Sequence, residues 1–147
     1  EADIKDLAAD LRRVRDFKSD QEAAEFKAKN AADRVRRAKI ELPARTWELA
    51  AETGADVKHV TVRNQRSRWG SCSHEGALMY SWRLIMAPPA VLTYVAAHEV
   101  AHLLEMNHSD RFWAVVDQLY PGWEAQRRWL HTQGAALHAL RFPTAGD

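Results

Sequence analysis

Apolar residues recur every three or four positions in the N-terminal part of the chain, and charged residues fill the positions between them. The repeat begins with Ile4, Leu7, Leu11, Val14 and Phe17. This spacing is that of one face of an α-helix, so we expect helix over residues 3–39, with a break near Ser19-Asp20. Pro43 is expected to end this region, and residues 44–53 to form a short helix that stops at Gly54.

Three segments in the middle of the chain have the pattern of β-strands. Val57–Arg63 alternates apolar and polar residues and is rich in β-branched side chains. Ala77–Ile85 alternates in the same way, and Trp69–Cys72 can pair with it through a turn at residues 73–76. We therefore expect a small, mainly antiparallel sheet.

Helical patterns return after the predicted sheet. Pro88 and Pro89 suit the first turn of a helix, and residues 91–105 are apolar on nearly every side, which is typical of a buried helix. Residues 109–120 and 123–140 are expected to form two further helices, separated by Pro121-Gly122. The order of elements predicts an α+β fold.

Composition narrows the class of protein. The 147 residues fit one domain, and a hydrophobic content of 46% with six tryptophans indicates a folded chain. The net charge of +1 gives no general attraction to nucleic acid or membrane, and no apolar run has the length of a membrane span. Cys72 is the one cysteine and cannot form an internal disulfide, which favours a reducing compartment and a cytoplasmic location.

Two arginine clusters, at residues 12–15 and 34–37, could contact phosphate. Acidic residues lie among and around them, however, so we interpret both as ordinary solvated helix faces. Nucleic acid is therefore not the partner that we favour.

The predicted buried helix carries His98, Glu99 and His102. Histidines four residues apart on an α-helix differ in direction by about 40°, so both imidazoles can reach one metal ion. Glu99 lies beside His98, near enough to bind a water on the metal rather than the metal itself. Burying these groups without partners would be unfavourable, so the pattern predicts a metal site.

A third histidine, His108, follows this helix. If the helix continued, His108 would lie about 240° around from His102 and about 9 Å further along. A shared ion therefore requires the chain to turn after about Glu105. Asn107 accepts the left-handed conformation of a helix end, and Ser109 can cap a following helix. His108 would then lie in the corner between two helices and point back at the metal.

Several segments of the chain belong together as one pattern. They are Arg68–Cys72, Trp82–Ile85 with Pro88, Tyr94–His102, and Asn107–Ser109 with Phe112 and Trp113, all within Val57–Leu130. This combination resembles the YgjP-like metal-dependent hydrolases, relatives of the SprT-like and minimal gluzincin metallopeptidases. Ser81 stands where that family usually has Asn.

The resemblance implies a zincin-like fold in which the sheet packs on the active-site helix. It also implies Zn²⁺ bound by His98, His102 and His108, with Glu99 as the catalytic carboxylate. On this basis we divide the chain into an N-terminal helical segment (1–42), a zincin-like metallohydrolase domain (43–141) and a frayed tail (142–147).

Three functions fit these residues. Three protein ligands leave one position open, as in catalytic zinc sites, so we favour a zinc-dependent peptidase in which Glu99 is the general base. A nucleoside triphosphate pyrophosphatase is the alternative, in which arginines such as Arg66 and Arg68 would bind phosphate. An inactive zinc-binding module is a third possibility, against which the intact Glu99 argues. Candidate donors to the oxyanion are Tyr80, Tyr94, Arg68 and His74.

Overall fold

One helix, α1, extends from Ala2 to Thr53 without interruption. The structure, a computed structural model, describes residues 2–141, and within them the side chains of residues 7–16, 18–26 and 29–141. The predicted break near Ser19-Asp20 is wrong, because the helix is continuous there. The predicted end at Pro43 is also wrong, because Pro43 lies inside the helix. A proline there costs about 3 kcal/mol. Burial of Leu42, Thr46 and Leu49 on the same stretch opposes that cost.

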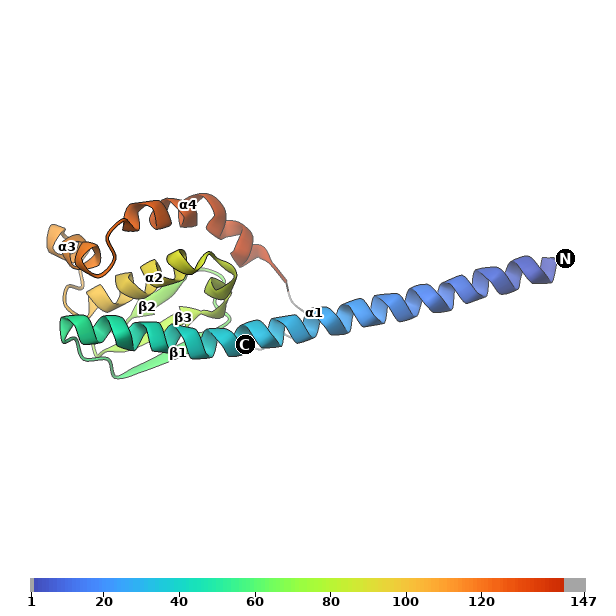
Figure 1. Ribbon diagram of the computed structural model, residues 1–147, viewed down its shortest axis with the longest axis horizontal. Helices are drawn as coiled ribbons and strands as arrows, with labels where there is room; N and C mark the ends of the chain where they lie inside the picture. Colours follow the sequence, from blue (N-terminus) through green and yellow to red (C-terminus); the bar gives the residue numbers. More distant parts are fainter. Residues whose placement is uncertain (1, 142–147) are drawn as a thin grey trace.

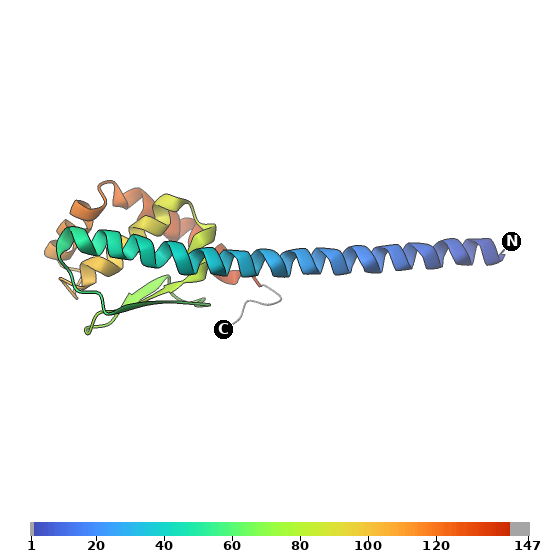
Figure 2. The same cartoon turned by 60° about the horizontal axis from the view of Figure 1, so that its bottom comes forward.

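The two ends of α1 lie in different surroundings. The N-terminal half projects away from the rest of the molecule (Figures 1 and 2), and Leu7, Leu11 and Val14 are exposed there. The apolar repeat therefore does not pack on the domain. From Ala31 onward the helix carries buried residues, including Ala38.

The arginine clusters of α1 have acidic partners on the same helix. Arg13 pairs with Asp10, and Arg36 pairs with Asp33. These side chains are largely exposed, as expected for a solvated helix face.

The sheet has three strands in the order β1-β3-β2. They are β1 (His59–Arg63), β2 (Gly70–Cys72) and β3 (Ala77–Ser81). β2 is antiparallel to β3 as expected, but β1 is parallel to it, so the sheet is mixed. The reason is that the segment between β1 and β2 carries the chain past the end of β3, so that β1 and β2 flank β3 on opposite sides.

β3 is shorter than the predicted strand. It ends at Ser81, and residues Trp82–Met86 form the 3₁₀-helix η1 instead. The buried Ser81 hydroxyl accepts a hydrogen bond from the Arg83 backbone N–H (3.3 Å) and donates one to the Gln65 carbonyl (2.7 Å). Ser81 therefore caps η1, and the change of direction comes from this cap.

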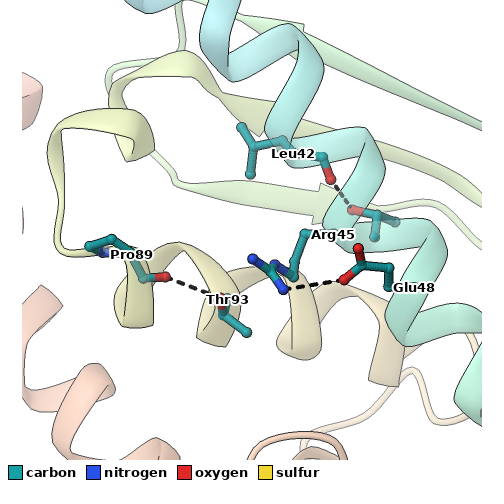
Figure 3. A network of polar contacts seen from close by, with 6 residues as sticks. Leu42, Arg45, Glu48, Pro89 and Thr93 are labelled. Carbon is teal, nitrogen blue, oxygen red and sulfur yellow. Dashed lines mark hydrogen bonds and ion pairs between the residues drawn. The ribbon is translucent and has the colours of Figure 1, made fainter.

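Three helices complete the fold: α2 (Pro89–His102), α3 (Asp110–Leu119) and α4 (Trp123–Ala139). α1 and α2 cover one face of the sheet, and α3 and α4 pack on the far side of α2 (Figures 1 and 2). Local hydrogen bonds, such as that from the Thr93 hydroxyl to the Pro89 carbonyl, lie where α2 runs beside α1 (Figure 3). The α+β class is confirmed.

The predicted cap at Ser109 is confirmed, because its hydroxyl accepts a hydrogen bond from the Phe112 N–H (3.4 Å). Pro89 is the first residue of α2, as its place in the first turn predicted, and Pro121-Gly122 separates α3 from α4. Among the described residues, no helix is both long and apolar enough to cross a membrane. The predicted frayed tail, residues 142–147, lies outside the described residues.

A buried arginine joins η1 to the end of α4. Arg83 is 1% exposed, and its guanidinium donates to the carbonyls of Leu137 (2.8 Å) and Leu140 (2.7 Å) and to the Asn64 side chain (3.1 Å). A cation at a helix C-terminus pairs with carbonyls that have no partner inside the helix. Arg83 therefore holds α4 against the domain.

Replacing Arg83 with Met should lower the free energy of unfolding by about 3 kcal/mol, because the part-buried carbonyls of Leu137 and Leu140 lose charge-assisted donors. Urea unfolding followed by circular dichroism measures the change. Arg13→Met, which removes the same charge from an exposed site, is the control and should change stability by less than about 1 kcal/mol. Equal effects of the two variants would contradict the role given to Arg83.

Candidate metal centre

α2 brings two histidines to one side of a helix that is otherwise buried. His98 and His102 are four residues apart on α2, and Glu99 lies between them in sequence. Val95, Val100 and Ala101 are buried on the same helix. The burial of the apolar residues therefore fixes the direction in which the two imidazoles point.

The chain turns sharply after α2. The N–H groups of Leu104 and Glu105 both bond to the Ala101 carbonyl (3.0 and 2.9 Å), and α3 begins at Asp110. The helix thus ends at His102, earlier than predicted. The left-handed residue expected at Asn107 is wrong, because no described residue other than glycine has a positive φ. The turn nevertheless returns His108 to α2, as the sequence predicts.

The three imidazoles converge. The Nε2 atom of His108 lies 3.3 Å from Nε2 of His98 and 3.1 Å from Nε2 of His102. Three nitrogens about 2.0–2.1 Å from one ion in tetrahedral geometry would be about 3.3 Å apart. The observed spacings fit that value, so the three histidines could hold a metal ion.

The His102 ring has a hydrogen bond that suits metal binding, whereas Nδ1 of the His98 ring is buried without a partner in the described part of the chain. Nδ1 of His102 lies 3.1 Å from the Glu105 carbonyl, which can only accept, so the proton of the neutral ring is on Nδ1 and the lone pair on Nε2. Burial and the neighbouring histidines lower the pKa of His98 to about 3, so this ring is neutral at pH 7. Lone pairs at such short spacing repel one another, and a cation between them removes the repulsion.

Phe112 supports all three rings from α3. Its ring is fully buried, and its centroid lies 4.9, 4.4 and 4.9 Å from those of His98, His102 and His108. Trp113 stacks beside His108 at 6.0 Å. The position of the Ser109 cap, three residues before Phe112, therefore also sets the orientation of the histidines.

Glu99 is buried beside this cluster. It is 6% exposed and has no hydrogen bond or ion pair with any described residue. Burial raises the pKa of its carboxyl to about 8, and the charge of Arg68 partly offsets this. A divalent cation nearby would lower the pKa again, because it favours the charged form.

Gly70 on β2 lies directly against this carboxylate. A Cβ atom at Gly70 would be 3.0 Å from both Cγ and Oε2 of Glu99 and 3.2 Å from the Met79 carbonyl oxygen. An alanine at this position would force the Glu99 side chain to shift, so the glycine gives Glu99 its room between α2 and the strand. Gly70 was not singled out from the sequence, although it stands inside the Arg68–Cys72 segment.

Comparison with known proteins gives the family. The family described as YgjP-like, metallopeptidase domain, matches residues 3–133. The chain belongs to the YgjP-like metallopeptidases. No curated protein matches it.

One solved structure is similar to this YgjP-like chain: the metallopeptidase zymogen of Pyrococcus abyssi abylysin. The TM-score is 0.53 and the identity 20%, over 63% of this chain and 95% of that one. At this identity the likeness shows the fold alone, and it confirms the zincin-like architecture. Family membership supports a metallopeptidase-type hydrolase and implies a metal.

The candidate oxyanion donors of this YgjP-like domain lie in different surroundings. The Tyr80 hydroxyl is fully buried and hydrogen-bonded to that of Thr46 (2.9 Å), so it is part of the core. Tyr94 is one turn before His98, with ring centroids 6.0 Å apart. The charge of Arg68 is felt at Glu99, whereas His74 lies exposed in the turn between β2 and β3.

We expect His108→Ala to weaken zinc binding by at least tenfold, because it removes one of three convergent nitrogens. Competition with a chromophoric chelator measures the affinity, and metal analysis should give one ion per wild-type chain. His59→Ala, at an exposed position on β1, is the matched control. Unchanged affinity in His108→Ala would exclude this histidine as a ligand.

Proposed function

We propose that this protein is a zinc-dependent metallopeptidase in which His98, His102 and His108 hold the ion and Glu99 is the general base. The convergence of three imidazole nitrogens beside a buried carboxylate without a partner carries this proposal. Imidazole ligands suit zinc, and three of them leave a position open for chemistry.

When bound, zinc lowers the pKa of a water molecule and polarises the carbonyl that the water attacks. Glu99 accepts the proton of that water and later transfers it to the leaving amine. Its burial and its lack of competing hydrogen bonds leave both carboxylate oxygens free for this transfer. The Gly70 backbone keeps the carboxylate on the side of α2 that faces β2.

The substrate backbone has a natural place along β2. This strand is at the edge of the sheet, and Gly70 on it touches Glu99. An extended peptide that adds to a sheet edge forms regular main-chain hydrogen bonds. A peptide bound to β2 would therefore pass beside the general base.

The pyrophosphatase alternative receives no support from the comparisons, which name only metallopeptidases. Its basis is the group of arginines around the loop between β1 and β2, where Arg63 and Arg66 line a shallow hollow. An activity screen with peptides and nucleoside triphosphates in parallel separates the two reactions. If the protein were a pyrophosphatase whose arginines bind phosphate, Arg66→Ala and Arg68→Ala would raise the Michaelis constant for a triphosphate.

Glu99→Gln should keep zinc but reduce peptide turnover by at least a hundredfold, since the amide cannot accept the proton. Cleavage of a casein-derived peptide mixture, followed by mass spectrometry, measures turnover, and metal analysis checks the zinc content. Removal of zinc with a chelator should abolish the wild-type activity, and added zinc should restore it. Wild-type activity in Glu99→Gln would refute the proposed base.

Gly70→Ala should lower kcat without preventing zinc binding, because the new methyl group displaces the Glu99 side chain and not the imidazoles. The expected loss is at least tenfold, in line with the sensitivity of catalysis to small misplacements. Ser71→Ala, on the same strand, is the matched control. A normal kcat in Gly70→Ala would show that the position of Glu99 is not critical.

A further inference from the structure

An aromatic wall extends from the metal centre to the start of α4. Trp113 stacks on Trp123, with centroids 4.4 Å apart and planes 19° apart, and Trp123 in turn stacks on Tyr94 at 6.4 Å. Trp113 and Tyr94 also contact the rings of His108 and His98. The wall is therefore continuous with the site.

Arg127 lies on this wall. Its guanidinium carbon is 5.1 Å from the centre of the Trp113 ring, a cation–π contact that holds a planar cation beside the aromatic rings. Trp113 in turn stacks beside His108, with ring centroids 6.0 Å apart. One aromatic ring therefore separates the Arg127 guanidinium from a candidate metal ligand.

The cations around the centre are not neutralised by the protein. Among the described residues, the ion pairs involve arginines of α1 and Lys58, and none involves Arg68, Arg127 or Arg128. Arg68 lies two residues before Gly70, which packs against Glu99, and Arg127 lies over Trp113, which stacks beside His108. The centre therefore lies between two positive charges, although the whole chain has a net charge of only +1.

A shallow groove of about 320 Å³ runs along α4 at this point. It is lined by Trp123, Glu124, Arg127, Arg128 and His131. The surface that lines the groove is mainly apolar, and the residues that form it include two arginines and one carboxylate, so its surroundings favour an anion over a cation. Its aromatic side gives a flat apolar surface on which the carbon atoms of a side chain can pack.

We propose that Arg127, held over Trp113, determines specificity by binding a carboxylate of the peptide substrate. This inference rests on the proposed peptidase function and names the class of substrate: peptides with an acidic residue close to the scissile bond. The planar guanidinium can form two parallel hydrogen bonds to a carboxylate, which a lysine could not.

Matched peptides test the proposal. A cleaved peptide is prepared with Asp or Asn at each position near the scissile bond, and each version has a free or an amidated C-terminus. Zinc-loaded wild-type protein should prefer Asp over Asn by about tenfold in kcat/KM at one position, the size expected for one charge-assisted hydrogen bond. A preference that follows the free C-terminus instead would identify the terminal carboxylate as the group that Arg127 binds.

Three variants locate the effect. Arg127→Met keeps the side-chain stem over Trp113 but should reduce the ratio of kcat/KM for Asp over Asn to between about one and two. Arg127→Glu should reverse the preference, so that the Asn peptide is cleaved faster than the Asp peptide. Arg13→Met, far out on α1, removes an equal charge and should keep the wild-type preference. In the zinc-loaded Glu99→Gln background, calorimetry should show about tenfold weaker binding of the Asp peptide when Arg127→Met is added.

The outcomes separate the two proposals. Peptide cleavage with no acidic preference, or a preference that survives in Arg127→Met, would overturn the role of Arg127 and leave the peptidase function intact. If zinc-loaded wild-type protein cleaves none of the peptides, including neutral ones, the proposed function itself fails.

Discussion

The burial of α2 is the constraint on which the rest of this structure depends. This helix has apolar residues on most of its surface, so the sheet, α1, α3 and α4 all pack around it. Two imidazoles and a carboxylate are carried into the interior with it. Groups of this kind are costly to bury without partners. The corner after α2 brings a third imidazole to the first two, and Phe112 braces all three rings. Glu99 and Nδ1 of His98 nevertheless have no hydrogen-bond partner among the described residues.

The two proposals give the two sides of the centre different tasks, and packing places the groups on both sides. On the sheet side, Gly70 leaves room for Glu99 and places an edge strand beside it. On the opposite side, α4 is anchored at its far end by Arg83, and at its near end it presents Trp123 and Arg127. In our proposals, β2 binds the peptide backbone and the α4 side binds a substrate side chain. Interactions remote from the candidate metal centre thus position the groups that we propose to contact a substrate.

Sequence patterns failed where long-range packing outweighed a local rule. Pro43 normally ends a helix, yet α1 continues through it because Leu42, Thr46 and Leu49 are buried on both sides of it. The alternation from Ala77 to Ile85 indicated one long strand, but the Ser81 cap turns the chain into η1. The alternation of apolar and polar residues also did not show the direction of strand pairing, because it is the same for parallel and antiparallel neighbours. The path of the chain between β1 and β2, across the end of β3, makes β1 parallel and β2 antiparallel to β3.

The sequence by itself determined the chemical groups of the candidate site and their local placement. These are two histidines on one face of a helix, a carboxylate beside the first, and a capped turn before the next helix. These features depend on residues within a few positions of one another, so local geometry fixes them. Only the tertiary structure decided which distant groups meet them. Three contacts are of this kind: Gly70 with Glu99, Phe112 with the imidazoles, and Arg127 with Trp113. They form because separate elements bury apolar surface against α2. The hydrophobic effect is not directional, so the pattern of apolar residues does not show which distant elements will meet.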